Sequence, residues 1–165
     1  MRKNRLNILV LLCVCLSFSF SRAQEVKIID FPGFEDRIQR SNDTLYIYNF
    51  WATWCRPCVK ELPYFTQLDS SFAEQKVKVE FISLDLLDQL EVAVKPMVKR
   101  KLPESRVLLL NAPKYHEWID KVSPEWSGAI PASLFVHKGR EIYTFKQQSF
   151  TYDELSTYVE QLLQD

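Results

Sequence analysis

The chain of 165 residues has little of what several common kinds of binding site require. It has three glycines and no glycine-rich run, so it lacks the backbone loop that cradles phosphate groups. It has only two histidines, His116 and His137, which leaves few candidate ligands for a metal. Positive charge is not in excess, because 21 basic residues balance 21 acidic ones. The composition therefore disfavours nucleotide, metal and nucleic-acid sites.

The chain also lacks a long uninterrupted apolar run, although its first 23 residues come close to one. Met1 to Arg5 is basic, Leu6 to Phe20 is mostly apolar, and Ser21-Arg22-Ala23 offers small residues for a cleavage site. This order is typical of a secretory signal peptide, so we predict that residues 1–23 are a signal peptide and that the protein is exported, most simply to a periplasm. The apolar run is shorter than the about 20 residues that a spanning helix needs. An uncleaved anchor stays open as the alternative.

Cleavage before Gln24 would change both the charge and the cysteine content. It removes four basic and no acidic residues, which leaves 17 basic against 21 acidic residues and argues against nucleic acid as a partner. It also removes Cys13 and Cys15, neither of which follows the small residue that lipidation needs. Two cysteines then remain, Cys55 and Cys58, in a compartment that favours disulfides. A single close pair indicates a reactive centre, since a small secreted scaffold would carry several bridges.

The pair lies where a predicted strand passes into a predicted helix. Residues 45–48 are apolar and prone to form a strand, and the apolar residues Val59, Leu62, Phe65, Leu68 and Phe72 recur at helical spacing. Cys55 would thus stand at a helix N-terminus, with Cys58 about one turn later on the same face. The positive end of the helix, the cation Arg56, a shielding Trp54 and a donor from Cys58 would all favour Cys55 as a thiolate. We interpret the pair as a dithiol–disulfide exchange centre.

A zinc site and a structural bridge are weaker interpretations of the same pair. Half of a zinc site would need two further ligands, and the two histidines are 21 residues apart, far from zinc-knuckle spacing. A purely structural disulfide over so short a loop would constrain little unfolded-chain entropy. Pro57 fits the first turn of a helix, where its missing N–H has no internal partner.

The remaining pattern alternates strands with helices and ends in a hairpin and a closing helix. We expect strands over residues 25–30, 44–50, 76–83, 107–110, 132–136 and 141–145, and helices over residues 34–40, from Cys55 onward, 86–101, 115–122 and 151–163. Thr151 and Glu154 form a capping box at the start of the last helix. The break at Phe31-Pro32-Gly33 should separate the first strand from the first helix. Residues 24–165 therefore form one domain of an α/β layered class.

Several residues together resemble one known family. Trp54, Cys55, Pro57 and Cys58 open a helix, an Ile130–Pro131 pair precedes the hairpin, and Glu61 and Pro63 complete a Cys-x-x-Cys-x-x-Glu-x-Pro pattern. The sequence resembles the thioredoxin superfamily, and within it the exported TlpA/ResA-like thiol–disulfide oxidoreductases. The resemblance implies a thioredoxin-like fold with a central mixed sheet flanked by helices. It also implies that Pro131 is cis and faces the cysteines, and that the Ile130 backbone pairs with a bound substrate.

Glu61 is the candidate proton acceptor. It stands three residues after Cys58, on the helix face turned toward the core. The resemblance implies a partly buried carboxyl group with a raised pKa that takes a proton from Cys58; a surface glutamate paired with Lys60 is the alternative. Thioredoxin itself has a buried aspartate where this chain has Asn49, and an amide group takes up no proton. The proton role therefore falls to Glu61.

The resulting hypothesis is a reductase of extracytoplasmic protein disulfides. Cys55 attacks the substrate, Cys58 resolves the mixed disulfide with help from Glu61, and Trp54, Arg56, Pro57, Ile130 and Pro131 contact the substrate. We expect a monomer that needs no cofactor beyond its own redox-active disulfide and no metal, and that is recharged by a membrane or periplasmic thiol reductant. The family suggests cytochrome c biogenesis as one setting.

Two alternatives and one group of aromatic residues stay open. The protein could act in the opposite direction as an oxidase or isomerase, although Arg56-Pro57 does not resemble the strongly oxidising Pro-His pair. It could instead be a thioredoxin-like binding module without turnover. Tyr115, Trp118 and Trp126 are either a substrate wall or ordinary packing, and the sequence assigns them no role.

Overall fold

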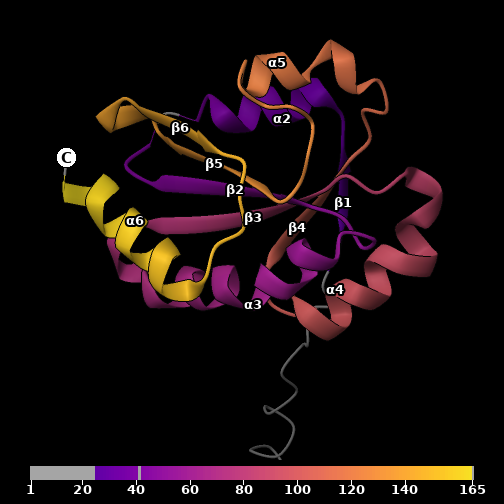
Figure 1. Cartoon of the computed structure of the whole chain (residues 1–165), viewed down its shortest axis with the longest axis horizontal. Coiled ribbons are helices and arrows are strands. Elements are labelled where there is room, and N and C mark those ends of the chain that lie inside the picture. The colour runs from indigo at the N-terminus through magenta and orange to yellow at the C-terminus, as the bar shows by residue number, and fades with distance from the viewer. Residues whose placement is uncertain (1–24, 41, 165) are drawn as a thin grey trace, which may run out of the picture.

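The computed structural model describes residues 25–40 and 42–164, and the expected signal peptide lies outside them. Six strands form one sheet in the order β1-β4-β3-β2-β5-β6 (Figure 1). Their bounds are β1 (Lys27–Ile29), β2 (Leu45–Trp51), β3 (Val77–Ser83), β4 (Arg106–Leu110), β5 (Ala132–His137) and β6 (Ile142–Lys146). The first four strands run parallel, and β5 and β6 run antiparallel to their neighbours. The mixed sheet expected for a thioredoxin-like fold is confirmed.

Helices cover both faces of this sheet. The α-helices are α2 (Phe31–Ile38), α3 (Arg56–Ser71), α4 (Lys95–Lys101), α5 (Ile119–Val122) and α6 (Tyr152–Gln164). Short helical turns are η1 (Ala73–Gln75), η2 (Leu87–Gln89), η3 (Leu90–Val94), η4 (Tyr115–Glu117) and η5 (Lys138–Arg140). Figure 1 shows α3, α4 and α6 on one face and α2 and α5 on the other. Within the described residues, no helix is both long and apolar enough to cross a lipid bilayer.

The central strand β2 supplies both layers of the core. All seven of its residues are buried, and alternate side chains point to opposite faces of the sheet. Ile47 packs in the cluster under α3 and α6, whereas Tyr48 packs in the cluster under α2 and α5. Because β2 is fixed from both sides, the segment that follows it leaves the sheet at a defined point.

Three of the expected helices differ in the structure, and the one expected over residues 115–122 is divided into η4 and α5. The helix expected from Phe34 begins at Phe31, because the Asp30 side chain accepts a hydrogen bond from the Gly33 backbone N–H at 2.9 Å and caps it. Pro32 is tolerated there because the first turn has no internal partner for its missing N–H. The apparent break at Phe31-Pro32-Gly33 is therefore a helix start.

The single helix expected over residues 86–101 is divided into η2, η3 and α4. Segment η3 is a π-helical turn, and the Lys95 N–H bonds to the Leu90 carbonyl at its end. Pro96 follows directly and has no N–H to continue the ordinary α-helical pattern. Leu90 is buried as expected, but Leu87, expected on the same face, is 44% exposed.

Candidate functional site

The cysteine pair occupies the connection from β2 to α3. β2 ends at Trp51 and α3 begins at Arg56, so Cys55 is the N-cap residue of the helix. The Cys58 backbone N–H donates to the Cys55 sulfur at 3.3 Å, which satisfies one of the free donors at this helix end. Pro57 lies in the first helical turn, as expected. The predicted position of Cys55 at a helix N-terminus is confirmed.

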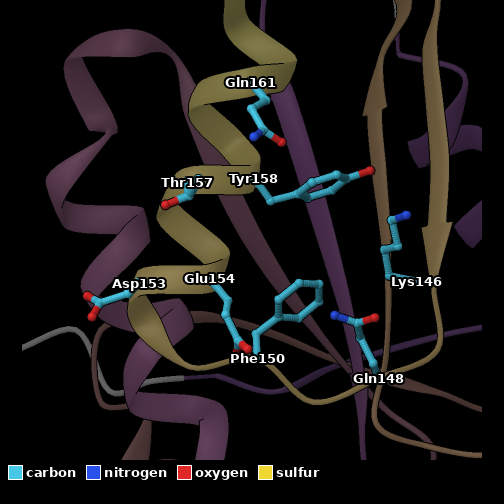
Figure 2. Close-up of a pocket in the computed structure, with 8 residues that line it drawn as sticks. All are labelled: Lys146, Gln148, Phe150, Asp153, Glu154, Thr157, Tyr158 and Gln161. Atoms are coloured by element: carbon cyan, nitrogen blue, oxygen red, sulfur yellow. The ribbon is translucent and has the colours of Figure 1, made fainter.

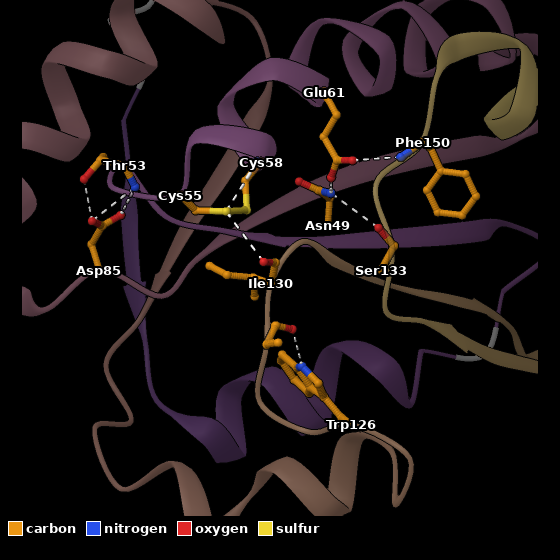
Figure 3. Close-up of a disulfide and its surroundings, with 11 residues drawn as sticks. Asn49, Thr53, Cys55, Cys58, Glu61, Asp85, Trp126, Ile130, Ser133 and Phe150 are labelled. Carbon is orange, nitrogen blue, oxygen red and sulfur yellow. Dashed lines mark hydrogen bonds between the residues drawn. A yellow bond between two sulfur atoms is a disulfide. The ribbon is translucent and has the colours of Figure 1, made fainter.

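The two sulfurs form a disulfide, shown in Figure 3. The Cα atoms are 5.3 Å apart, within the usual range for a disulfide. The two residues differ in access, because Cys55 is 6% exposed and Cys58 is 0% exposed. Only the Cys55 side of the bond can therefore be reached from solvent without movement of the helix.

The Ile130–Pro131 segment lies against Cys55. The peptide bond between these two residues is cis, as the resemblance implied. The Cys55 sulfur is 3.8 Å from the Ile130 carbonyl oxygen, although the residues are 75 positions apart. Behind this segment, the Trp126 indole N–H donates to the Ala129 carbonyl at 2.8 Å and fixes the loop (Figure 3). The structure thus brings Cys55, Cys58 and Ile130 together at one end of the sheet.

Glu61 lies about one turn after Cys58 on α3 and is buried, with 2% of its surface exposed. Its carboxylate accepts a hydrogen bond from Asn49 Nδ2 at 2.9 Å and another from the Phe150 backbone N–H at 3.0 Å (Figure 3). Burial raises the pKa of Glu61 from 4.5 to about 7, and the two donors oppose that rise without cancelling it. In the described part of the chain no cation forms a salt bridge with Glu61, so the alternative of a surface pair with Lys60 is wrong.

Asn49 couples this carboxyl group to the strand after Pro131. Its Nδ2 also lies 3.3 Å from the Ser133 hydroxyl, whereas its Oδ1 is buried without a hydrogen-bond partner among the described residues. A half-turn of the Asn49 amide would present Oδ1 to Glu61 in place of Nδ2. Asn49 is thereby able to accept from a protonated Glu61 as well as donate to an ionised one.

The side chains that flank the disulfide are open to solvent. Trp54, which is next to Cys55 in the sequence, is 70% exposed, so most of its ring faces solvent. Arg56 and Pro57 are exposed as well. These three residues surround the accessible side of the disulfide and are free to contact another molecule.

Asp85 is a residue of this site that the sequence analysis missed. It is 3% exposed and accepts hydrogen bonds from the Thr53 backbone N–H at 3.0 Å and the Thr53 hydroxyl at 2.6 Å. The Ser83 hydroxyl donates to it at 2.9 Å. Asp85 therefore ties the loop that carries Cys55 to the end of β3. Asp85 could have been found from its position in the sequence, because Thr53 and Asp85 each follow one of two neighbouring parallel strands.

A cavity of about 500 Å³ lies between β6 and α6, apart from the disulfide (Figure 2). Phe150 and Tyr158 form its apolar wall, and the Lys146 ammonium lies 5.1 Å from the centre of the Tyr158 ring. Neither cysteine lines this cavity. Among the described residues, no group of three or more His, Cys, Asp or Glu side chains is placed to hold a metal ion.

The chain is similar to known proteins over most of its described length. The Thioredoxin family model matches residues 25–123. A thiol-disulfide oxidoreductase ResA of Bacillus cereus is 32% identical over 118 residues, which cover 61% of this chain and 66% of that protein. The match thus spans slightly less than two thirds of that relative. ResA of Geobacillus kaustophilus is 22% identical over 143 residues, which cover 86% of this chain and 76% of that protein.

Solved structures share the same arrangement of strands and helices. A thioredoxin-related protein from Neisseria meningitidis serogroup B superimposes with a TM-score of 0.64 at 18% identity, over 77% of this chain and 90% of that one. The thioredoxin domain of a thiol-disulfide oxidoreductase from Bacteroides vulgatus gives a TM-score of 0.58 at 18% identity, over 89% of this chain and 99% of that one. With a family match over more than half its length, the chain belongs to the thioredoxin family.

Proposed function

We propose that this protein is an exported thiol–disulfide oxidoreductase that reduces disulfides of extracytoplasmic proteins. The observation that carries the proposal is a disulfide with one accessible sulfur, Cys55, at the N-terminus of α3 and 3.8 Å from the Ile130 carbonyl. A buried carboxyl group, Glu61, lies on the same helix three residues after Cys58. This arrangement suits a two-step exchange of disulfides.

In the first step, the reduced protein attacks the client. The Cys55 thiolate is stabilised by the Cys58 backbone N–H and by the positive end of α3. It forms a bond to one sulfur of the client disulfide, and the other client sulfur leaves as a thiolate. The client segment next to its cysteine lies along Ile130 and Pro131, which are half-buried, and bonds to the backbone of Ile130.

In the second step, Cys58 resolves the mixed disulfide. Glu61 in its ionised form takes the proton from the Cys58 thiol, and the new thiolate attacks the Cys55 sulfur. The Cys55–Cys58 bond forms, the bond between Cys55 and the client breaks, and the second client sulfur leaves as a thiolate. Two electrons have then passed from the cysteine pair to the client disulfide. A pKa of about 7 lets Glu61 accept this proton near neutral pH and return it afterwards.

The cycle closes when another protein reduces the Cys55–Cys58 disulfide, and we assign this step to a thiol reductant of the membrane or periplasm. The reducing direction rests on Arg56-Pro57 between the cysteines, which does not resemble the strongly oxidising Pro-His pair. Export rests on residues 1–23, which have the pattern of a secretory signal peptide. Apocytochrome c is one class of client, in which a disulfide between the haem-site cysteines would be reduced to thiols, as the resemblance to ResA proteins suggests.

Trapping the mixed disulfide tests the proposal. A Cys58→Ser variant lacks the resolving thiol, so it should retain a client on Cys55 as a covalent adduct on a non-reducing gel. The double variant Cys55→Ser/Cys58→Ser is the matched control and should retain none. If Cys58→Ser captures no disulfide protein in the extracytoplasmic fraction, the assignment of roles to the two cysteines is wrong.

A further inference from the structure

A client disulfide has chain on both sides of its cysteines, and Ile130–Pro131 accounts for one side only. We propose that the client chain on the other side crosses an apolar edge of this protein and places one uncharged aromatic or large aliphatic side chain in a cavity beside Trp118. The cavity has a volume of about 450 Å³ and lies next to the first turn of α2. This inference rests on the proposed function, because it names how the client of that reaction is held.

Exposed apolar side chains lead from the disulfide toward this cavity. Trp54 is 70% exposed, Leu86 is 56% exposed and Tyr115 is 38% exposed. They stand on the segments that follow β2, β3 and β4, which are adjacent parallel strands. Because the carboxyl ends of parallel strands meet at one edge of a sheet, the three side chains share the edge that carries Cys55.

Hydrogen bonds hold these three segments together. Asp85, at the end of β3, binds the backbone and side chain of Thr53, the residue before Trp54. On its other side, the Tyr115 hydroxyl donates to the Leu84 carbonyl at 3.2 Å. Residues 84 and 85 are therefore the common anchor for the loop of Trp54 and the turn of Tyr115. The edge is a fixed surface, which is what a docking site for an extended chain requires.

Tyr115 joins this edge to the cavity. Its ring centre lies 5.7 Å from that of Trp118, and the Trp118 ring stacks on Phe31 at 5.6 Å. Trp118 and Phe31 line the cavity together with Ala112 and Pro113, so the apolar surface continues from the edge into the cavity. The sequence left Tyr115 and Trp118 without a role.

The charges that line the cavity balance, because the two cations Lys114 and Lys121 are matched by the two carboxylates of Glu35 and Glu117. The Lys114 ammonium pairs with Glu117 at 3.0 Å, and the Lys121 ammonium lies 5.5 Å from the centre of the Phe31 ring. A charged side chain would gain no net attraction from this balanced lining and would lose hydration on entering, whereas an uncharged apolar one would not. This balance, together with the aromatic walls, favours an aromatic or large aliphatic occupant.

The spacing of the strands sets the position of that occupant in the client. Adjacent strands lie about 4.8 Å apart, so β4 is about 10 Å from β2, and the cavity lies beyond it on the α2 face. An extended chain advances about 3.3 Å per residue, which puts the occupant on the order of three to five residues from the reactive client cysteine. The aromatic cluster also extends toward Ile130. The ring centres of Trp118 and Trp126 are 5.7 Å apart, and the Trp126 indole N–H donates to the Ala129 carbonyl.

Short peptides with a chromogenic leaving group test the proposal. Each peptide has one cysteine, disulfide-bonded to thionitrobenzoate, so that attack by Cys55 on the peptide sulfur releases a coloured thiolate. A phenylalanine is moved along an otherwise Gly/Ser peptide, on either side of the cysteine. The glutathione adduct of thionitrobenzoate is the control, because glutathione is too short to reach the cavity. With the reduced protein, we expect one position about three to five residues from the cysteine to raise the second-order rate constant about tenfold.

Variants of the edge and the cavity sharpen this test. Tyr115→Ala should remove most of the gain, and Tyr115→Phe, which keeps the ring but loses the bond to the Leu84 carbonyl, should retain more of the gain than Tyr115→Ala does. Ala112→Leu narrows the cavity at a half-buried position and should also remove the gain. All three variants should react with the glutathione adduct at the wild-type rate.

The results distinguish a failure of the cavity proposal from a failure of the proposed function. A rate independent of the phenylalanine position, with normal reaction of the glutathione adduct, would overturn the cavity and leave the proposed function intact. Equal slowing of peptide and glutathione adducts by Tyr115→Ala would do the same. Failure of reduced wild-type protein to react with either adduct would overturn the proposed function and the cavity with it.

Discussion

Glu61 and Glu80 are two buried glutamates whose surroundings differ completely. Glu80, on β3, is 0% exposed, and its carboxylate accepts from Arg37 at 2.9 Å, Arg40 at 3.0 Å and Arg106 at 3.0 Å. Glu61, on α3, is 2% exposed, and among the described residues its carboxylate accepts from the Asn49 amide and the Phe150 backbone N–H alone. Burial alone therefore does not set the role of a carboxyl group. Three guanidinium groups hold Glu80 in a cluster of ion pairs. Glu61 has no such cation among the described residues, and its raised pKa lets it exchange a proton near neutral pH.

The largest expected effect is a loss of stability when Glu80 is changed. Glu80→Gln removes the charge that three arginines share, and it leaves those cations without their buried partner. We expect the free energy of unfolding to fall by about 3–5 kcal/mol at pH 7. Urea unfolding of the variant measures this change, and Glu61→Gln under the same conditions is the comparison. A loss below about 1 kcal/mol for Glu80→Gln would show that the arginines contribute little to stability.

The next largest effect is at Glu61, where the change to glutamine should raise the free energy of unfolding. Its pKa in the folded protein is about 7, against 4.5 for the ordinary group, so the folded state keeps a proton that the unfolded state releases. Stability from this group is complete below about pH 4.5 and is lost as the pH rises through 7. The loss is about 3 kcal/mol at most. Glu61→Gln cannot ionise and should not show this loss. Its free energy of unfolding, relative to that of the wild type, should therefore increase between pH 5 and pH 8.

The difference between the two proteins isolates this group, since all other titrating groups are shared. Unfolding free energies at several pH values would give its profile. A difference that does not vary with pH would contradict the raised pKa of Glu61.

A smaller effect is expected at the neutral partner of Glu61. Asn49→Leu removes the amide that donates to the carboxylate and so raises the pKa of Glu61 further. The pH at which stability falls should therefore move upward, and the variant should lose about 1 kcal/mol or more through the lost hydrogen bond. Asn49→Gln is the matched polar control. An unchanged midpoint in Asn49→Leu would mean that the Asn49 amide has no influence on Glu61.

The burial of Glu61 could be predicted from the sequence, whereas the burial of Glu80 could not. Glu61 stands three positions after Cys58 on a strongly periodic helix, so its burial was predictable from spacing. Glu80 stands in an alternating strand, where its neighbours indicate only that one face is polar. Its burial depends on Arg37, which is 43 residues away in sequence and is brought there by α2. Local patterns contain no information about such a partner.

The other sequence-based predictions also succeeded where local patterns determine the structure and failed where distant contacts do. The cysteine pair, the strand before it and the order of strands and helices follow from local periodicity and turn residues. The start of α2 was misplaced because Asp30 caps it with a side chain, and the division of the segment at residues 86–101 follows from the missing N–H of Pro96. Asp85 was missed because its function depends on Thr53, on a neighbouring strand. Residues whose roles arise from contacts across the sheet were the ones that the sequence could not assign.

The most direct test of this account is the titration of the Glu61 carboxyl group itself. The oxidised protein, labelled with carbon-13 at the glutamate side-chain carboxyl, would be followed by NMR from about pH 3 to pH 9, and the resonance missing in Glu61→Gln would identify the group. The account predicts a midpoint at about pH 7. A midpoint near 4.5, the ordinary value for glutamate, would contradict it and remove Glu61 as the acceptor of the Cys58 proton.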